Sequence, residues 1–334
     1  MKIAVIGAGA IGGLVAGYLK AKDEAITLVG RPDAVRAIKE NGLLISGVRG
    51  DFKFKIEAVE RLSLKPDLVI LAVKTQDIEV ALKDNQEYIQ GALVLTTQNG
   101  LQADEIVSRY APKEQIISSI VMFGATALEP GSIVHNFEGP WIIGRIFASN
   151  DAAIVSVSNL LNKAFAAIAA EEIKGMKLLK LFVNANNCIP AILGLSMQEA
   201  FSDVEISRIA MAIWREGLEV TNRCGMQLVS LPDFPLERLT KLTSLPLSES
   251  TKIYSGIMLN LSKEPLYGSI LQSIKRGKKS EIDYINGEFV HLAQKNQLVA
   301  PLNEKLVEMV HGVERNNKFF SPEELKAAIG EMVN

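Results

Sequence analysis

The segment GMKLLKLFVNANNCIP at residues 175–190 is mostly apolar, yet it contains two lysines and three asparagines. On a helix, Lys180 and Asn184 would lie four residues apart on one face, with Cys188 a further turn along. A lysine in such a place can supply a proton and a positive charge to a developing alkoxide, and amides can bind a carboxylate. The alternative is a lysine that extends its ammonium from a domain edge into solvent, a role that suits Lys177.

A second chemical motif, GAGAIG, occupies residues 7–12. It follows an apolar run and opens a helical pattern. In that context one glycine permits a tight turn, one lets the backbone approach a pyrophosphate, and one lets the helix pack close to the strand. The phosphates would meet free N–H groups at the helix N-terminus. We therefore expect this loop to bind a dinucleotide through Gly7, Gly9, Ala10, Ile11 and Gly12. The alternative is a glycine-rich turn that only packs against its neighbours.

The residue that follows the second apolar run distinguishes an NAD-binding site from an NADP-binding site. A carboxylate there would accept hydrogen bonds from the ribose hydroxyls, whereas an arginine would pair with a 2′-phosphate. The run ends in VGRPD, so Arg31 follows at once and Asp33 lies beyond a proline. Asp33 already suits the first turn of the next helix, where the helix dipole favours a carboxylate. We therefore predict that Arg31 binds the 2′-phosphate and that the cofactor is NADP(H).

Polar side chains also follow two later apolar runs. Lys74 and Gln76 come after DLVILAV, and Asn99 comes after ALVLTTQ. If these runs are parallel strands, both sites lie at carboxyl ends, where open α/β sheets bind their ligands. We expect all three residues to contact the cofactor. The alternatives are a surface lysine and a simple Asn-Gly turn.

The elements that must position these residues alternate between strand and helix in the first half of the chain. Apolar runs predict strands at residues 2–6, 25–30, 67–73, 92–97 and 116–121, and two more, SIVHNF and PWIIGRI, within 132–146, with helices at 11–21 and 32–42. This alternation is typical of a parallel sheet covered on both faces. From residue 151 the patterns are helical, most clearly at 202–225, 280–296, 301–314 and 321–334. We predict an α/β fold, with a Rossmann-type doubly wound parallel sheet over residues 1–170 and an all-α domain over residues 171–334.

Composition narrows the classes of function. The 334 residues are 48% apolar and 22% charged, as in globular proteins. A net charge of -2, without a long basic tract, argues against a nucleic-acid partner. The densest basic run, KRGKK at 275–279, reads as a solvated helix end, with an anion site as the alternative.

The cysteines and histidines give predictions about cellular location and metal binding. Two cysteines without a CxxC motif predict a reducing, cytoplasmic location, and three isolated histidines predict no metal site. The apolar N-terminus is better explained by its glycine pattern than by a signal peptide. No other run of roughly 18 apolar residues predicts a membrane span.

The chain resembles the ketopantoate reductase (2-dehydropantoate 2-reductase) family over nearly its whole length. The matching N-terminal motifs are GAGAIGG at the start, LAVKT at 71–75 and TTQNG at 96–100; the C-terminal ones are KLFVNANN at 180–187 and SILQSIKRGKKSEIDYINGEFV at 269–290. The resemblance implies that NADPH gives a hydride to the keto carbon of ketopantoate, producing pantoate for pantothenate and coenzyme A biosynthesis. It also implies a Rossmann domain joined to a helical domain, with the active site in the cleft between them.

The resemblance also implies roles for single residues. Lys180 matches the general acid of the family, and Glu281 matches a carboxylate that anchors substrate at the catalytic centre. Without the resemblance, Glu281 reads as a carboxylate in the first turn of the helix expected at 280–296, where the helix dipole favours it. Asn184 and Ser269 match positions that contact substrate. Asn99 matches a residue that helps position the lysine and the nicotinamide.

The chain departs from the family pattern at Cys188, where many members have asparagine; Asn187 or Asn186 could substitute, and we include Asn187 among the substrate-binding residues. KEPLYG, before Ser269, also lacks an asparagine often found there. These departures keep a second enzyme open, an NADPH-dependent reductase of another 2-keto acid. A non-catalytic NADP sensor is a third alternative, although a sensor needs no proton donor. A homodimer also stays open, because apolar periodicity does not distinguish an interface from a core.

Overall fold

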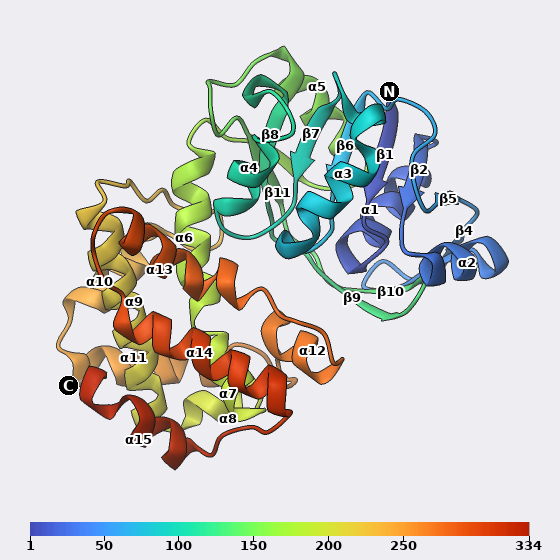
Figure 1. Ribbon diagram of the computed structural model, residues 1–334. Helices are drawn as coiled ribbons and strands as arrows, with labels where there is room; N and C mark the ends of the chain where they lie inside the picture. The colour runs from blue at the N-terminus through green and yellow to red at the C-terminus, as the bar shows by residue number, and fades with distance from the viewer. Residues whose placement is uncertain (334) are drawn as a thin grey trace. The chain divides into compact units, whose positions relative to one another are not determined.

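The computed structural model describes residues 1–333 (Figure 1). Its contacts divide the chain into two compact units, of which the first is Met1–Lys177 and the second begins at Leu178. In the described part of the chain, no helix combines the length and the apolar character that crossing a bilayer requires.

The first unit is built on a sheet that has eight strands within the described residues, in the order β12-β11-β8-β7-β6-β1-β2-β5. The strands are β1 (Lys2–Ile6), β2 (Ala25–Val29), β5 (Glu57–Val59), β6 (Leu68–Leu71), β7 (Leu93–Thr96), β8 (Ile116–Val121), β11 (Trp141–Gly144) and β12 (Ala167–Ala169). Neighbours from β5 to β8 are parallel, whereas β11 runs antiparallel to β8. The predicted fold class is confirmed, with an antiparallel edge that the apolar runs did not indicate.

The strand order reverses beside β1. The chain moves outward from β1 through β2 to β5, then returns to β6 on the other side of β1 and moves outward again through β7 and β8. In doubly wound sheets, ligands bind at such a reversal, outside the carboxyl ends of the strands. The loops that follow β1 and β6 therefore flank the expected crevice.

Helices cover both faces of this sheet. They are α1 (Ala10–Lys20), α2 (Pro32–Asn41), α3 (Ile78–Ile89), α4 (Gln102–Val107) and α5 (Ala152–Leu161), with short turns η1 (Thr75–Asp77) and η2 (Lys113–Gln115). Leu14 of α1 and Val157 of α5 belong to one buried cluster, whereas Leu82 of α3 and Val107 of α4 belong to another. Strands buried on both sides explain why the apolar runs were nearly continuous.

A smaller sheet, with the order β4-β3-β10-β9, also belongs to the first unit. Its strands are β3 (Leu43–Gly47), β4 (Phe52–Phe54), β9 (Gly124–Glu129) and β10 (Ser132–Phe137). Of the two strands predicted within residues 132–146, the first is β10 of this smaller sheet and the second is β11 of the main sheet. We did not predict β3, β4, β5, β9 or β12, because none of these strands has a continuous buried run.

The second unit is helical. Its helices are α7 (Cys188–Leu193), α8 (Met197–Ser202), α9 (Val204–Arg223), α10 (Leu236–Ser244), α11 (Leu247–Leu259), α12 (Ser269–Lys275), α13 (Asn286–Lys295), α14 (Pro301–Asn316) and α15 (Pro322–Val333), with the turn η3 (Ile282–Tyr284). Helix α6 (Ile173–Ala185) begins in the first unit and continues into the second. The helix predicted from residue 202 starts at Val204, because the Asp203 side chain accepts a hydrogen bond from Glu205 N at 2.8 Å and caps it. The last residue of the helix predicted at 321–334 lies outside the described residues.

Candidate active site

Each glycine of the first loop has its own structural reason. Gly7 has φ +118°, and a Cβ there would lie 2.6 Å from the carbonyl carbon of Ala72 at the end of β6. A Cβ on Gly12 would collide with the carbonyl oxygen of Gly7, so a side chain would push α1 away from β1. A Cβ on Gly9 would meet nothing within 4 Å. Gly7 and Gly12 therefore shape the loop, whereas Gly9 leaves space beside it.

The open space beside Gly9 adjoins the N-terminus of α1. Gly9 is the N-cap of this helix and has no side chain to satisfy the first N–H groups. The N–H groups of Ala10, Ile11 and Gly12 have no partner within the helix, because they belong to its first turn. Free N–H groups at the positive end of a helix dipole fit a pyrophosphate. The residues present thus fit a dinucleotide cofactor.

Arg31 lies at the same edge of the sheet, after β2. Its side chain is exposed, and the residue is the N-cap of α2. The neighbouring Gly30 allows close packing on the glycine loop, because a Cβ there would lie 2.7 Å from Ala8 Cβ. Asp33 stands in the first turn of α2, where the dipole favours a carboxylate. The end of β2 is therefore followed first by an exposed guanidinium, and the exposed carboxylate of Asp33 comes two residues later, inside the helix.

Lys74, Gln76 and Asn99 follow adjacent parallel strands. Lys74 precedes η1 and Gln76 lies within it, after β6, whereas Asn99 follows β7. All three are partly buried. Gly100, with φ +76°, turns the chain directly after Asn99. The structure thus brings the predicted cofactor residues to the carboxyl ends of four neighbouring strands, β2, β1, β6 and β7.

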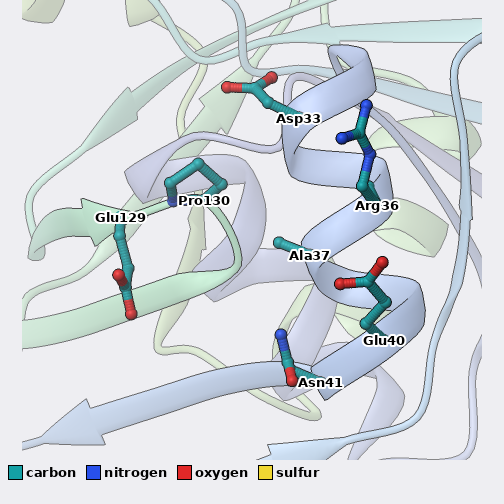
Figure 2. Close-up of a pocket in the computed structure, with 7 residues that line it drawn as sticks. All are labelled: Asp33, Arg36, Ala37, Glu40, Asn41, Glu129 and Pro130. Carbon is teal, nitrogen blue, oxygen red and sulfur yellow. The ribbon is translucent and has the colours of Figure 1, made fainter.

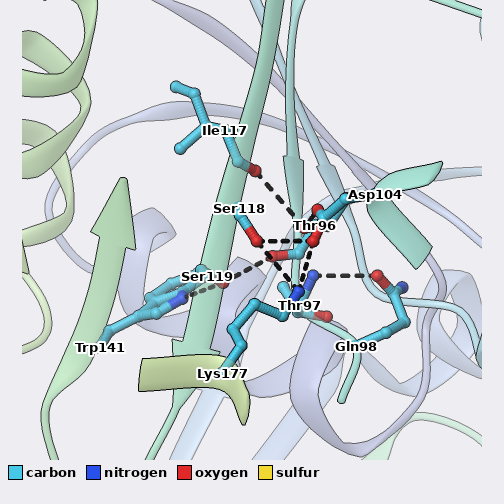
Figure 3. Close-up of polar contacts among 9 residues, drawn as sticks. All are labelled: Thr96, Thr97, Gln98, Asp104, Ile117, Ser118, Ser119, Trp141 and Lys177. Atoms are coloured by element: carbon cyan, nitrogen blue, oxygen red, sulfur yellow. Dashed lines mark hydrogen bonds and ion pairs between the residues drawn. The ribbon is translucent and has the colours of Figure 1, made fainter. Parts of the chain in front are cut away.

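Gln98 holds two of these loops together, although the sequence analysis did not single it out. Its side-chain amide donates to Leu71 O at 2.8 Å and to Val73 O at 2.7 Å, both at the end of β6. Its side-chain oxygen accepts from Thr97 N at 3.1 Å (Figure 3). Gln98 is 5% exposed, so these bonds are shielded from water. It therefore fixes the loop before Asn99 to the loop before Lys74.

In the second unit, α6 presents one narrow polar stripe. Between residues 178 and 185 the partly exposed side chains are Lys180, Val183 and Asn184, and their neighbours are buried. Phe182 is fully buried, and its carbonyl accepts from Trp214 Nε1 at 2.7 Å. At roughly 100° per residue, Lys180 and Asn184 both lie about 160° from Phe182, on the opposite side of the helix. Burial of Phe182 therefore turns both predicted site residues away from the core of this unit.

The environment of Lys180 changes its acidity. Burial lowers the pKa of this lysine from 10.5 to about 8, because desolvation disfavours the charged form. The carboxylate of Asp233 acts in the opposite direction and raises the pKa of Lys180. Asp233 lies in an exposed turn between α9 and α10, and nothing in the sequence indicated its proximity. A lysine with a pKa near neutral pH is suited to proton transfer.

Cys188 does not continue the face of Lys180 and Asn184, so that expectation was wrong. Helix α6 ends at Ala185, and Cys188 begins the separate helix α7. The cause is Pro190, which lacks an N–H and whose ring would clash with the carbonyl of residue 186 in a continuous helix. Cys188 is fully buried, and burial raises the pKa of its thiol to about 12.

The break places Asn187 beside Ser269. A Cβ on Gly268 would lie 3.1 Å from both Cβ and Cγ of Asn187, so glycine permits this close approach. Ser269 follows Gly268 directly, is exposed, and begins α12. Two residues predicted to bind substrate, 82 positions apart in the sequence (269 minus 187), therefore lie near each other.

Glu281 lies in a break before a helix. The helix expected from residue 280 begins only at Asn286, and Glu281 precedes the short turn η3. A role for Glu281 as a first-turn carboxylate of that helix is therefore wrong. Its neighbour Ser280 is buried and donates its backbone N–H to Glu314 Oε1 at 2.7 Å, and Ile282 is fully buried. These two neighbours hold the partly exposed Glu281 between them.

Lys177 is not a surface lysine, contrary to the alternative role that its sequence suggested. It is 2% exposed, and its ammonium forms an ion pair with Asp104 at 2.6 Å. Lys177 is therefore buried in an ion pair, whereas Lys180 of the same helix is partly exposed.

A surface pocket of about 320 Å³ lies elsewhere in the first unit (Figure 2). It is lined by one face of α2 and by the turn between β9 and β10: Asp33, Arg36, Ala37, Glu40, Asn41, Glu129 and Pro130. Most of these side chains are exposed, and three are acidic. None of the predicted cofactor or substrate residues lines it, so we assign it no part in the site.

Comparison with known proteins gives two family matches. The family "Ketopantoate reductase PanE/ApbA" matches residues 3–146, and "Ketopantoate reductase PanE/ApbA C terminal" matches residues 172–314. A 2-dehydropantoate 2-reductase of Pyrococcus abyssi (strain GE5 / Orsay) is 33% identical over 317 residues, which cover 94% of this chain and 98% of that protein.

Solved structures share the fold. D-mandelate dehydrogenase in complex with NADH matches with a TM-score of 0.80 and 25% identity, covering 95% of this chain and 100% of that one. A PanE/ApbA family ketopantoate reductase from Ralstonia eutropha JMP134 matches with a TM-score of 0.80 and 23% identity, covering 94% of this chain and 99% of that one. The second likeness shows the fold alone.

Proposed function

This chain belongs to the ketopantoate reductase (PanE/ApbA) family, and from that premise we propose that it reduces 2-dehydropantoate to pantoate with NADPH. The observation that carries the proposal is Lys180, a lysine whose pKa burial lowers to about 8 and whose helix also presents Asn184 on the same side. Ketone reduction needs one proton donor close to the developing alkoxide, and such a lysine provides it at neutral pH. The enzyme is an oxidoreductase of pantothenate biosynthesis.

In this mechanism the residues of the chain handle the proton and the orientation of substrate. The nicotinamide, when bound, supplies the hydride that forms the new C–H bond at the keto carbon. Lys180 donates its proton to the keto oxygen as the carbonyl π electrons move onto it, so the oxygen ends as a hydroxyl and the lysine as a neutral amine. The ammonium also stabilises the negative charge while it develops.

The substrate contacts come from several segments. We propose that Asn184, Asn187 and Ser269 bind the substrate through amide and hydroxyl groups, and that Glu281 anchors it at the catalytic centre. Asn187 and Ser269 lie near each other beside Gly268, which supports a joint role. Neutral donors of this kind suit a carboxylate or hydroxyl ligand.

The cofactor contacts come from the first unit. We propose that the N–H groups around Gly9 bind the pyrophosphate and that Gly7 and Gly12 shape their loop. Arg31 would pair with the 2′-phosphate, which makes NADPH the preferred cofactor. Lys74, Gln76 and Asn99 would contact the remainder, in places that Gln98 fixes.

A second candidate is reduction of a different 2-keto acid. Cys188 stands fully buried at a position where the family resemblance leads us to expect an asparagine, so a thiol replaces an amide there. The structural match to D-mandelate dehydrogenase also supports this candidate, because mandelate, the substrate in the name of that enzyme, is an aromatic 2-hydroxy acid and not pantoate.

Steady-state kinetics separate the candidates. Ketopantoate, another branched 2-keto acid and phenylglyoxylate are each reduced with NADPH and with NADH, and kcat/KM values are compared. We expect ketopantoate with NADPH to give the highest value. A higher value for another keto acid would replace the substrate proposal, and cofactor binding without turnover of any of them would favour a sensor.

A further inference from the structure

One buried carboxylate joins three elements of the first unit (Figure 3). Asp104 of α4 accepts from Thr96 Oγ1 at 2.6 Å, at the end of β7, and from Ser118 Oγ at 2.7 Å, on β8. Its oxygen Oδ2 also accepts from the Lys177 ammonium at 2.6 Å, on α6. Lys177 donates a second bond to Ser118 Oγ at 3.0 Å. We call Thr96, Asp104, Ser118 and Lys177 the anchor network.

The anchor network is enclosed in the protein. Thr96, Asp104 and Ser118 are fully buried, and Lys177 is 2% exposed. A buried ion pair is a weak source of stability, because desolvation of the two charges offsets their attraction, and apolar residues of similar size often serve as well. What an ion pair provides and an apolar contact lacks is direction, since the charges must meet at hydrogen-bonding distance. The network therefore fixes geometry at the points where its members lie.

Those points adjoin residues of the proposed chemistry. Lys177 precedes Lys180 by three residues on the same helix, so the two lie roughly 4.5 Å apart along its axis. Thr96 ends β7, three residues before Asn99. Its carbonyl also accepts from Ser119 Oγ at 2.6 Å, which fixes the backbone of this strand end.

We propose that the anchor network is a positioning device, in which Asp104 and Lys177 hold helix α6 and the loop after β7 so that Lys180 and Asn99 keep their productive places. This inference deepens the proposed function and rests on it. Asp104 and Lys177 touch no reacting atom in this scheme and act only through Lys180 and Asn99. A displacement of about 1 Å in a catalytic group can lower a rate roughly a hundredfold, so a positioning role predicts a large effect from a remote pair.

The test replaces the pair without leaving a buried charge. The double variant Lys177→Met/Asp104→Leu removes both charges together and keeps similar volumes. We expect it to fold, to bind NADPH with a Kd raised by less than about threefold, because Asn99 is only one of several proposed cofactor contacts, and to lose about tenfold or more in kcat. The double variant Arg49→Met/Glu138→Leu is the control, because it removes an ion pair of the same unit, more exposed than Lys177–Asp104. Arg49 also contacts Tyr18, Ala164 and Phe165, which lie outside α6 and the loop after β7. The kcat of this control should stay within about twofold of the parent value.

A second measurement does not depend on turnover. Hydrogen exchange of the α6 amides around Lys180 should accelerate in the Lys177→Met/Asp104→Leu variant and stay unchanged in the control, even if the chain reduces no 2-keto acid. Unchanged exchange together with an unchanged kcat would overturn the positioning role. If the double variant does not fold, Ser118→Ala, which removes two bonds of the network and keeps both charges, is measured in the same way. It should lower kcat about threefold with NADPH binding intact, and a parent-like kcat would overturn the proposal.

Discussion

The glycine loop and the polar stripe of α6 differ in what defines them. The loop is defined by backbone: Gly7 and Gly12 have no room for a Cβ, and Gly9 leaves helix N–H groups open. The stripe is defined by two side chains whose properties depend on other residues. The buried Phe182 of the same helix sets their direction, and Asp233, far away in the sequence, supplies the charge near Lys180. A site made of backbone can be read from a short motif, whereas a site made of side chains takes its chemistry from the surrounding fold.

The largest expected effect comes from a substitution in the polar stripe that changes catalysis and leaves cofactor binding, the role of the glycine loop, unchanged. Lys180→Ala should lower kcat by about 10²–10⁴, the usual contribution of a general acid, and leave the Kd of NADPH unchanged. Lys174→Ala, at an exposed position of the same helix, is the control and should leave both quantities unchanged. Rapid-mixing kinetics and a fluorescence titration of NADPH measure them. A near-normal kcat for Lys180→Ala would show that another group donates the proton.

Lysines 177 and 180 show why the loop was easier to predict than the stripe. The reasons for each glycine are local, and the strand, turn and helix around them were predicted almost to the residue. Lys177 was assigned to the surface because its partner Asp104 lies 73 residues away in the sequence. No periodicity within α6 indicates that one lysine pairs inside the first unit while the other stays partly exposed.

The same contrast applies to the rest of the fold. Strands that are buried along their whole length have continuous apolar sequences and were found, whereas β3, β4, β5, β9 and β12 have no continuous buried run and were missed. The break between α6 and α7 was predictable in principle, because Pro190 cannot continue a helix through residue 186. Gln98 gave no such signal, since its role depends on two carbonyls of a neighbouring strand.

The second largest effect concerns Arg31, the charged residue that follows β2 and is proposed to bind the 2′-phosphate of NADPH. Arg31→Ala should weaken NADPH binding by about 10- to 100-fold, the loss of hydrogen bonds to a charged group, and leave NADH binding nearly unchanged. Arg36→Ala, one turn along α2 and also exposed, is the matched control. Isothermal titration with both cofactors measures the difference. Equal losses for NADPH and NADH would remove the 2′-phosphate from the role of Arg31.

A single added methyl group tests the backbone character of the loop. Gly9→Ala should leave the thermal unfolding midpoint unchanged, since a Cβ there meets nothing within 4 Å, but it should weaken NADPH binding about tenfold by occupying the space of the pyrophosphate. Gly256→Ala adds the same group at another open position, in α11 of the second unit, and should not change binding. Unchanged NADPH affinity in Gly9→Ala would place the pyrophosphate elsewhere.

The pH profile tests the side-chain character of the stripe. With a pKa of about 8, Lys180 is a protonated donor below that pH and loses its proton above it. Reduction should therefore slow about tenfold per pH unit above 8, whereas oxidation of the alcohol, which needs the neutral amine as a base, should accelerate through the same pH. Measurements of kcat/KM in both directions from about pH 6 to about pH 10 give the midpoint of the enzyme without bound substrate. A midpoint near the ordinary lysine value of 10.5 would show that burial does not act on Lys180 as the structure indicates.

The smallest effect probes how far the fold sets the chemistry of one side chain. Asp233→Asn removes a negative charge that raises the pKa of Lys180, so the alkaline limb should move to lower pH by roughly a few tenths of a unit. The shift should shrink at high salt, because Asp233 is exposed and its field is screened. Glu237→Gln, which neutralises another exposed carboxylate nearby in the sequence, is the charge-matched control. A shift in the opposite direction would mean that Asp233 acts on the site by another route, whereas a small downward shift would tie the acidity of Lys180 to a turn outside the sequence motifs that carry the family resemblance.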